Sequence, residues 1–417
     1  MRQLLHLLIV DGGRRAALAT TFRGKWLLPV VTCTERARSA PLVARWLVER
    51  DLRGDVAGQW LGRVTENAMD WLVAIAATYG SAIADPAFQW RPLDTLEATA
   101  AVVEYQQWAI ARAVRHGELP VVSGPFGNLS WPDRARAWIA SVTGSAVESL
   151  TPYRVSAHEV VVGAGCANGR VYCKGLTRER AAEARLTRIL AAIEPESFAR
   201  TLALEDRDDG SVWWLTAACN GRSGENLNRV AAALARIQQR VLAGGVSREV
   251  PRLDLEAAAR WASELVGESR CADAVGRRCA QVMRADVPAS WIPMDLDPTN
   301  VLVDGDNRVR FIDVDDSFLG PAPLAMATLA TRCDDKSLCR TYERSWSPAL
   351  VGLDWIAFET AATVVQSWLG WRRLERHIAR GEVVVDREFA AARTRDRLVK
   401  AIDGRSPCRA LPGGRAV

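Results

Sequence analysis

The stretch WIPMDLDPTNVLVDGDNRVRFIDVDD, residues 291–316, holds seven aspartates among short apolar runs. Residues 301–303 and 309–312 are rich in β-branched and aromatic side chains, which predicts two strands joined by an Asp-Gly-Asp-Asn turn. An acidic hairpin of this kind is either a solvated turn or a group of acids that face one another around a metal ion. The first alternative predicts no function, whereas the second predicts an active site.

The spacing of the polar residues favours the second alternative. Asn300 follows Asp295 by five residues and Asp313 follows Asn300 by thirteen, so a tight hairpin brings Asn300 and Asp313 together at one end. Phosphoryl transfer needs a carboxylate that accepts the proton of the attacking hydroxyl, and it needs oxygen ligands for Mg²⁺. Two aspartates and an asparagine on one hairpin supply these three parts.

The stretch resembles the catalytic segment of the aminoglycoside phosphotransferase-like branch of the protein-kinase-like fold. The usual form of that segment is H-G-D-[LF]-x-x-x-N-[VI]-[LV], followed by a strand with I-D-[WFV]. Residues 293–302 match the first part and residues 311–316 the second. Pro293 stands in place of the usual His and Met294 in place of the usual Gly. Because that His mostly organises the loop, the substitution removes no group that the chemistry requires.

The resemblance implies a role for each polar residue of the motif. Asp295 is expected to be the catalytic base, Asn300 a metal ligand and Asp313 the main metal ligand. The cofactors implied are ATP, with GTP as an alternative, and Mg²⁺.

The same resemblance implies a nucleotide site upstream, with a Lys late in a strand and a Glu on the next helix. Lys174 ends the predicted strand 170–174 and Glu183 lies on the predicted helix 177–193, so this pair is expected to orient the α- and β-phosphates. In isolation, Lys174 is equally explained as a surface lysine at the end of a strand.

Two further residues complete the predicted nucleotide site. Ser156 lies in the turn between the first two strands of the unit, where a phosphate-binding loop is expected, although the turn lacks a G-x-G-x-x-G pattern. Ala217 lies near the end of the predicted strand 212–218, where backbone groups are expected to meet the adenine. Late helical residues are candidates for the acceptor site, namely Trp368, Trp371 and Glu375.

The first part of the chain resembles a Nudix hydrolase. It has a strand hairpin at residues 3–20, then a W-x-L-P segment and a predicted helix 39–52. When the Nudix box is aligned on this segment, its metal-binding Glu positions fall on Trp46, Glu49 and Arg50. Neither Trp nor Arg offers an anionic oxygen to Mg²⁺. We therefore expect a folded domain without pyrophosphatase activity, and an unrelated α/β domain is the alternative.

Composition limits the remaining classes of function. A chain of 417 residues suits two or three domains. The net charge of +5 is small and spread along the chain, so no nucleic-acid partner is predicted. Nine cysteines without a CxxC pair indicate reduced thiols and a cytoplasmic location. No segment approaches the ~20 apolar residues that span a bilayer, so no membrane partner is predicted.

The sequence thus predicts an α+β protein, with a Nudix-like α/β/α N-terminal domain before a bilobal protein-kinase-like phosphotransferase domain. The predicted function is transfer of the ATP γ-phosphoryl group to a hydroxyl of an aminoglycoside-like or other small metabolite. The alternative is a pseudokinase that senses nucleotide or acts as a scaffold without turnover. The oligomeric state is not predicted. The expected divisions are residues 1–118 (degenerate Nudix-like domain), 119–150 (linker and leading helix), 151–220 (N-lobe), 221–404 (helical C-lobe with the catalytic hairpin) and 405–417 (disordered tail).

Overall fold

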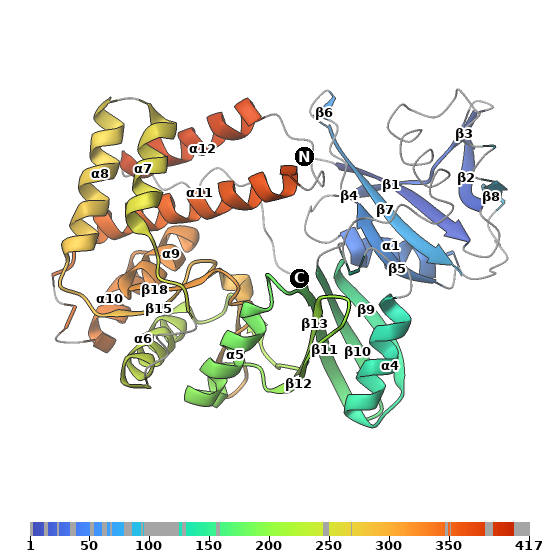
Figure 1. Ribbon diagram of the computed structural model, residues 1–417, viewed down its shortest axis with the longest axis horizontal. Coiled ribbons are helices and arrows are strands. Elements are labelled where there is room, and N and C mark those ends of the chain that lie inside the picture. The colour runs from blue at the N-terminus through green and yellow to red at the C-terminus, as the bar shows by residue number, and fades with distance from the viewer. Residues whose placement is uncertain are drawn as a thin grey trace. The chain divides into compact units, whose positions relative to one another are not determined.

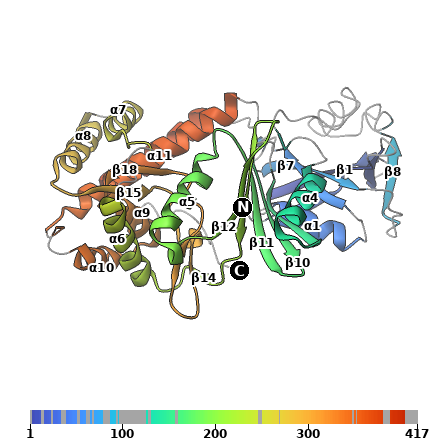
Figure 2. The same ribbon diagram turned by 60° about the horizontal axis from the view of Figure 1, so that its bottom comes forward.

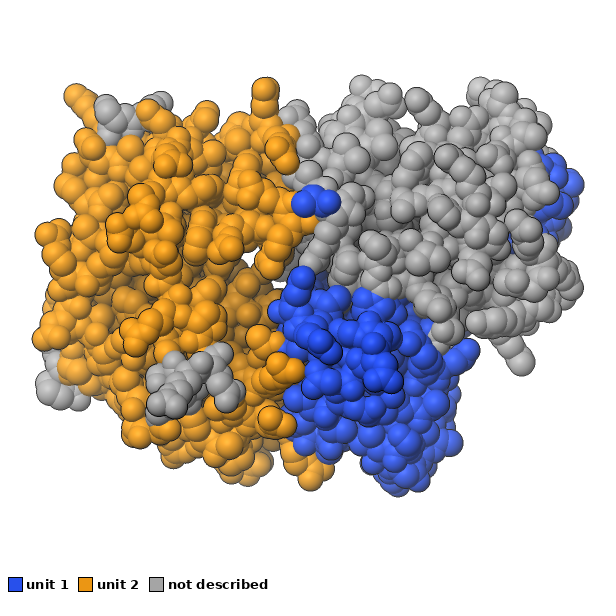
Figure 3. Space-filling view, in the orientation of Figure 1, with its two compact units in different colours: residues 1–181, 201–218, 378–384 blue, residues 182–200, 219–377, 385–417 orange. Residues whose placement is uncertain are grey.

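The computed structural model of this protein describes residues 3–11, 16–22, 25–33, 39–50, 54–60, 65–66, 69–78, 86–92, 95, 125–126, 131–155, 159–244, 250–267, 269–346, 349–350, 352–379 and 387–403. Two predictions fall outside these residues, namely the turn residue Ser156 and the tail at 405–417. The chain forms two compact units, coloured in Figure 3. Unit 1 comprises residues 1–181, 201–218 and 378–384, and unit 2 comprises residues 182–200, 219–377 and 385–417.

Unit 1 begins with a mixed eight-stranded sheet whose main order is β3-β2-β1-β7-β5. The predicted hairpin is confirmed, because β1 and β2 pair antiparallel with Val10 opposite Ala17. Helix α1 (Ser39–Val48) is shorter than predicted, since a turn at residues 49–50 ends it. The strands are β1 (Gln3–Asp11), β2 (Ala16–Phe22), β3 (Lys25–Leu27), β4 (Val30–Cys33), β5 (Gly54–Trp60), β6 (Thr65–Glu66), β7 (Met69–Thr78) and β8 (Phe88–Pro92).

The second sheet of unit 1 is antiparallel, with the order β12-β13-β11-β10-β9. Its strands are β9 (Val147–Val155), β10 (Glu159–Cys166), β11 (Gly169–Thr177), β12 (Thr201–Asp206) and β13 (Ser211–Ala217). Residues 211–216 of β13, which lies between β12 and β11, are all buried. Helix α4 (Trp131–Thr143) runs beside this sheet (Figure 1) and buries Trp131, Trp138 and Ile139 in the same core.

Unit 2 is mostly helical, as the sequence predicts from residue 227 onward. Its helices are α5 (Ala182–Ile193), α6 (Leu227–Gly244), α7 (Leu255–Val266), α8 (Ser269–Arg284), α9 (Pro323–Cys333), α10 (Ser337–Trp346), α11 (Trp355–Ala379) and α12 (Arg387–Ile402). Helices α7 and α8 lie side by side in Figures 1 and 2. Asp254 caps α7 by accepting the backbone N–H of Ala257 at 2.8 Å, and Gly267 ends it with a φ of 71°.

Short strands interrupt the helices of unit 2 where the acidic stretch lies. The predicted hairpin is confirmed as β16 (Val301–Val303) and β17 (Val309–Phe311), which pair antiparallel, and β14 (Arg222–Ser223) joins β16. The pairing of β15 (Ala289–Pro293) with β18 (Ser317–Pro321), which encloses this hairpin, was not predicted. The described part of the unit also contains the 3₁₀ helices η2 (Pro195–Ser197) and η3 (Pro298–Asn300).

One predicted helix needs correction. The apolar spacing predicts a helix over residues 177–193, but α5 begins at Ala182. The preceding residues form turns instead, in which the N–H of Arg180 donates to the carbonyl of Thr177 at 2.9 Å. The mixed α+β class, with sheet-rich and helical parts, is confirmed. The Nudix-like identity of the first sheet and the predicted domain boundaries stay predictions.

Candidate active site

Asp295 lies two residues after the end of a buried strand. In β15 the last four residues are buried, and Trp291 and Ile292 are fully so. Met294, at the position of the usual Gly, is also buried, and its N–H donates to the carbonyl of Asp316 at 2.8 Å. The loop is therefore anchored by apolar burial and by a backbone bond to the end of the acidic stretch, without the usual His.

Asn300 bonds the predicted base with its side chain and the residue before Asp313 with its backbone. Its Nδ2 donates to the backbone carbonyl of Asp295 at 3.0 Å, which leaves the amide oxygen for another partner. The carbonyl of Asn300 in turn accepts the N–H of Ile312 at 2.9 Å. Asp313 is the next residue. Asn300 is thus bonded to Asp295 and to the residue before Asp313, at one end of the β16–β17 hairpin.

Asp313 has a left-handed backbone conformation, with a φ of 71°. The extended strand β17 ends two residues earlier, so the positive φ turns the chain sharply at this point. Asp and Asn adopt this conformation more readily than other residues with side chains. The left-handed conformation of Asp313 therefore ends the extended course of the hairpin just after the bond between Ile312 and Asn300.

These residues suit Mg²⁺, which prefers oxygen ligands and keeps substrate phosphates and water among them. Asp313 carries a carboxylate and Asn300 an amide oxygen, which are ligand types that a hard cation prefers. Within the described part of the chain, no group of three or more His, Cys, Asp or Glu side chains is arranged to hold a metal ion.

The carboxylate of Asp295 is held by an arginine that the sequence did not indicate. Arg332, on α9, donates from Nη2 to Oδ1 of Asp295 at 2.6 Å and from Nη1 to Oδ2 of Asp297 at 2.9 Å. No local motif marks this residue, which lies 37 positions after Asp295.

Asp297 is fixed independently of the arginine. It caps η3 by accepting the N–H of Thr299 at 2.9 Å and the Thr299 hydroxyl at 2.7 Å. Burial alone raises the pKa of the Asp297 carboxyl, but the hydrogen bonds from Thr299 and the charge of Arg332 outweigh it and hold that pKa below its ordinary value. Asp297 is therefore an ionised, fixed partner for the arginine.

A second arginine pairs with the end of the acidic stretch. Arg373, on α11, forms a hydrogen-bonded ion pair with Asp316. On the same helix, Gln366 donates to the carbonyl of Met294 at 3.4 Å and accepts from Arg397 of α12 at 2.7 Å. Helix α11, predicted to lie near the acceptor, thus contacts both ends of the acidic stretch.

The predicted acceptor residues Trp368 and Trp371 contact other side chains of unit 2. The guanidinium of Arg372 lies 5.0 Å from the ring centroid of Trp368. Trp371 stacks near Trp261 of α7, with their ring centroids 6.3 Å apart. Both tryptophans are half-buried, and nothing in these contacts assigns them to an acceptor.

The predicted nucleotide residues lie in both units. Lys174 is on β11, opposite Val161 of β10 and Trp214 of β13, and its Nζ lies 5.6 Å from the Trp214 ring centroid. Glu183 is buried in the first turn of α5. Lys174 belongs to unit 1 and Glu183 to unit 2, so their ion pair stays a prediction.

Of the two remaining predicted nucleotide residues, the structure describes Ala217 but not Ser156. Ala217 is the last residue of β13 and pairs with Val171 of β11, so the predicted strand is confirmed but contact with adenine stays a prediction. Ser156 lies outside the described residues, between the end of β9 and the start of β10.

The positions aligned with the Nudix metal ligands contain no site of that kind. Trp46 is buried, with its ring centroid 5.5 Å from that of Phe88. The guanidinium of Arg50 lies 4.1 Å from the Trp46 ring centroid. A cation stacked on an aromatic ring occupies the place where this alignment puts two metal-binding carboxylates.

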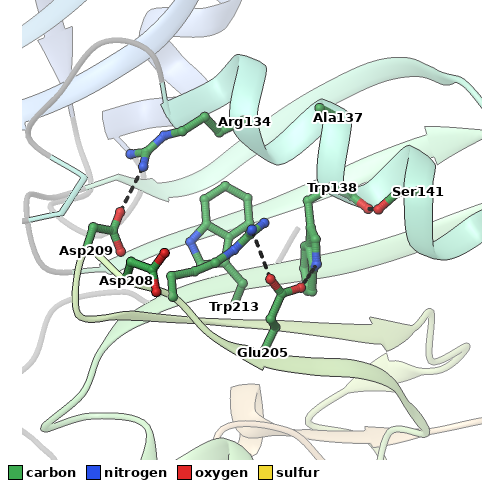
Figure 4. Close-up of a pocket in the computed structure, with 9 residues that line it drawn as sticks. Arg134, Ala137, Trp138, Ser141, Glu205, Asp208, Asp209 and Trp213 are labelled. Atoms are coloured by element: carbon green, nitrogen blue, oxygen red, sulfur yellow. Dashed lines mark hydrogen bonds and ion pairs between the residues drawn. The ribbon is translucent and has the colours of Figure 1, made fainter.

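A cavity of about 650 Å³ in unit 1 lies between α4 and the β12–β13 hairpin (Figure 4). Its polar groups pair with one another, since Arg134 contacts Asp209 at 2.8 Å and the Trp138 indole donates to Glu205 at 2.6 Å. Arg207 also pairs with Glu205, at 2.9 Å. None of the predicted site residues lines this cavity.

The cysteines that the structure describes in full are all free, which agrees with the prediction of reduced thiols. They are Cys166, Cys173, Cys219, Cys271, Cys279, Cys333 and Cys339. The described residues also include no helix with the length and apolar character needed to traverse a bilayer.

No protein-family model matches the sequence, and no curated protein matches it. Among solved structures, the chain is similar to the GDP complex of a wild-type aminoglycoside 2'-phosphotransferase, with 14% identity, a TM-score of 0.50, and coverage of 66% of this chain and 98% of that one. It is also similar to a spectinomycin phosphotransferase in complex with ADP and spectinomycin, with 9% identity, a TM-score of 0.51, and coverage of 66% and 98%.

A choline kinase from Streptococcus pneumoniae matches with 13% identity, a TM-score of 0.49, and coverage of 66% of this chain and 99% of that one. At sequence identities this low, structural similarity shows the fold and does not show the reaction. Over about two thirds of its length, the chain has the protein-kinase-like fold of the aminoglycoside phosphotransferases.

Proposed function

We propose that this chain transfers the γ-phosphoryl group of ATP, with GTP as an alternative donor, to a hydroxyl group of a small molecule. The observation that carries the proposal is the pair of hydrogen bonds at one end of the hairpin that joins Asn300 to the carbonyl of Asp295 and to the N–H of Ile312, the residue before Asp313. These bonds occur in a chain whose fold matches two phosphotransferases solved with bound nucleotides.

In the proposed reaction, Asp295 accepts the proton of the acceptor hydroxyl as its oxygen attacks the γ-phosphorus. A bond forms between that oxygen and phosphorus, and the bond from phosphorus to the β–γ bridging oxygen breaks, which releases ADP. Asn300 and Asp313 would hold Mg²⁺, which neutralises phosphate charge when bound. Lys174 and Glu183 orient the phosphates, while Ser156 and Ala217 contribute to the nucleotide site.

The acceptor is a small alcohol, and the substrates named for the similar proteins are candidates for a first panel. Those proteins are an aminoglycoside 2'-phosphotransferase, a spectinomycin phosphotransferase and a choline kinase. We propose residues 151–220 and 221–404 as the two lobes, and residues 1–118 as a Nudix-like domain without a catalytic metal site.

The test compares Asp295→Asn with the wild type in radiolabelled phosphate transfer to a panel of aminoglycosides, sugars and amino alcohols. Loss of a general base is expected to lower turnover by about 10²–10⁴-fold. The affinity for Mg-ATP, measured by calorimetry, should stay within about threefold, since the base contacts the acceptor rather than the nucleotide. Asp306→Asn at the exposed hairpin tip is the matched control and should retain wild-type turnover.

Wild-type turnover in Asp295→Asn would refute the assignment of the base. Absence of nucleotide binding in the wild-type protein would refute the function as a whole.

A nucleotide-binding protein without turnover is the second candidate. The ion pair of Arg332 with Asp295 favours it, because this pair engages one oxygen of the proposed base. This candidate predicts that the wild type binds Mg-ATP yet neither phosphorylates any acceptor in the panel nor hydrolyses ATP.

A further inference from the structure

Arg332 connects two carboxylates of the proposed active site through different nitrogens. Nη2 lies 2.6 Å from Oδ1 of Asp295, and Nη1 lies 2.9 Å from Oδ2 of Asp297. The three side chains are only 24%, 30% and 32% exposed, respectively. Partial burial reduces solvent screening, and both bonds join charged groups, so each is stronger than a bond between neutral groups.

The arginine comes from a rigid part of unit 2. Residues 323–330 of α9 are all buried, and the helix ends just after Arg332, where Asp334 adopts a left-handed conformation. Thr331 bonds its hydroxyl to the carbonyl of Ala327 at 2.7 Å within the same helix. Since Asp297 is fixed by η3, the guanidinium is held by its helix at one end and by a fixed carboxylate at the other.

This arrangement defines the orientation of the Asp295 carboxylate. The Asn300 side chain donates a hydrogen bond to the backbone carbonyl of Asp295, and Arg332 donates one to Oδ1 of the Asp295 side chain. Among the described residues, Oδ2 of Asp295 accepts no hydrogen bond, so this oxygen remains for a hydroxyl proton. A base needs both features, a fixed carboxylate and a free oxygen within reach of the reacting hydroxyl.

We infer that Arg332 is a positioning residue, which holds Asp295 by Oδ1 so that Oδ2 accepts the proton of the acceptor hydroxyl. Asp297 acts through Arg332 by fixing its guanidinium. The inference rests on the proposed phosphotransfer function. It requires a planar guanidinium that reaches two carboxylates at once, which the single ammonium of a lysine does not reproduce.

The experiment measures kcat and KM of full-length Arg332→Ala and Arg332→Lys with the best acceptor of the panel. Misplacement of the base is expected to lower kcat of Arg332→Ala by about 100-fold, because small displacements of catalytic groups have effects of that size. KM for Mg-ATP should change by less than about twofold, since the interaction acts on the reacting groups rather than on nucleotide binding. Guanidinium ion at millimolar concentration should restore part of the lost kcat, and Arg332→Lys should restore less than Arg332→Ala with guanidinium.

Asp297→Asn provides a second variant, which leaves Arg332 in place. Asp297→Asn should lower kcat less than Arg332→Ala does. The double variant should have the same kcat as Arg332→Ala alone, because Asp297 acts through the arginine. Arg260→Ala is the matched control, since Arg260 pairs with Glu256 within one exposed face of α7.

A kcat of Arg332→Ala within twofold of the wild type would overturn the inference. A rise in kcat would also overturn it, and would identify the ion pair as an inhibitory lock. A loss that guanidinium does not restore, together with a lower melting temperature, would assign Arg332 a purely structural role. If the wild type itself lacks turnover, the proposed function fails first, and this inference fails with it.

Discussion

Asp313 has two roles, since its backbone adopts a left-handed turn and its carboxylate is proposed to bind Mg²⁺. The described residues other than glycine with positive φ are Asn226, Asn307, Asp313 and Asp334, and every one is Asn or Asp. These side chains adopt the left-handed region at low cost because they hydrogen-bond to the nearby backbone. At Asp313 the turn therefore permits a carboxylate but not a β-branched side chain.

Asp313→Gly separates the two contributions of this residue. Glycine adopts the same φ without strain, so the melting temperature should change little. Without the carboxylate, Mg²⁺-dependent ATP binding should fall by at least about tenfold, since a metal ligand is lost. Calorimetry with and without Mg²⁺ measures this effect, and Asn307→Gly at the hairpin tip is the matched control. Unchanged Mg²⁺ dependence in Asp313→Gly would exclude Asp313 as a ligand.

At the scale of helices and strands, the packing around a position determines the size of the side chain that fits there. Gly175 lies on the interior strand β11, where an added Cβ would come within 2.6 Å of the Phe126 ring and 2.7 Å of Val160. Gly276 lies inside helix α8, where an added Cβ would meet no heavy atom within 4 Å. The same substitution should therefore have opposite effects in the two elements.

Gly175→Ala should lower the free energy of unfolding by about 1–3 kcal/mol, the usual cost of overpacking a core. Gly276→Ala should raise it by about 0.5–1 kcal/mol, because alanine favours the helix and loses less backbone entropy on folding. Urea unfolding followed by circular dichroism measures both variants. A stable Gly175→Ala protein would mean that Phe126 moves aside without cost.

At the scale of the whole molecule, a buried glutamine joins distant parts of unit 2. Gln238 of α6 is fully buried and donates from Nε2 to the carbonyls of Trp291 at 2.8 Å and Ala322 at 3.0 Å. Its Oε1 accepts the hydroxyl of Tyr342, and its own carbonyl accepts the hydroxyl of Ser290 at 2.8 Å. The residue thus connects α6 with β15, α10 and the start of α9, and it supports the strand that precedes Asp295.

Gln238→Leu should lower the free energy of unfolding by about 3 kcal/mol, because three buried polar groups lose their partner at about 1 kcal/mol each. Gln239→Leu is the matched control. Gln239 is exposed and makes one side-chain bond, to the carbonyl of Ser345 at 3.0 Å, so its loss should cost less than about 1 kcal/mol. Equal effects of the two substitutions in urea unfolding would contradict the role of Gln238.

Burial also determines which thiols react. Burial raises the pKa of Cys173, Cys279 and Cys339 from the ordinary 9.0 to about 12. A raised thiol pKa keeps the group neutral in the folded state while the unfolded chain ionises above pH 9, so this contribution to stability is present below pH 9 and is lost as the pH rises toward 12.

Native protein treated with iodoacetamide between pH 7.5 and 9 should therefore stay unmodified at these three thiols, because the thiolate is the reactive form. Cys219, Cys271 and Cys333, which are half-buried, should react faster. Peptide mapping by mass spectrometry measures each site, and protein in urea is the control in which all thiols should react. Rapid native modification of Cys279 would contradict its burial.

Local patterns were sufficient for many elements of the fold. The apolar runs around residues 301–312 predict β16 and β17 nearly to the residue, and the predicted strand 212–218 agrees with β13 to within one residue at each end. The β15–β18 pair was missed because its two strands lie on either side of the hairpin, and pairing at that distance has no local signal. Helix α5 was predicted too long because apolar spacing continues through a turn that only hydrogen bonding reveals.

The amino-acid order alone specified the spacing of Asp295, Asn300 and Asp313 and the hairpin that links the last two. Short-range sterics and turn chemistry suffice for these features. Only the folded chain joins Arg332 to Asp295 across 37 residues, and Gln238 to Tyr342 across 104. Such partners depend on how buried helices pack against one another, and that packing minimises exposed apolar surface over the entire unit rather than within any one segment.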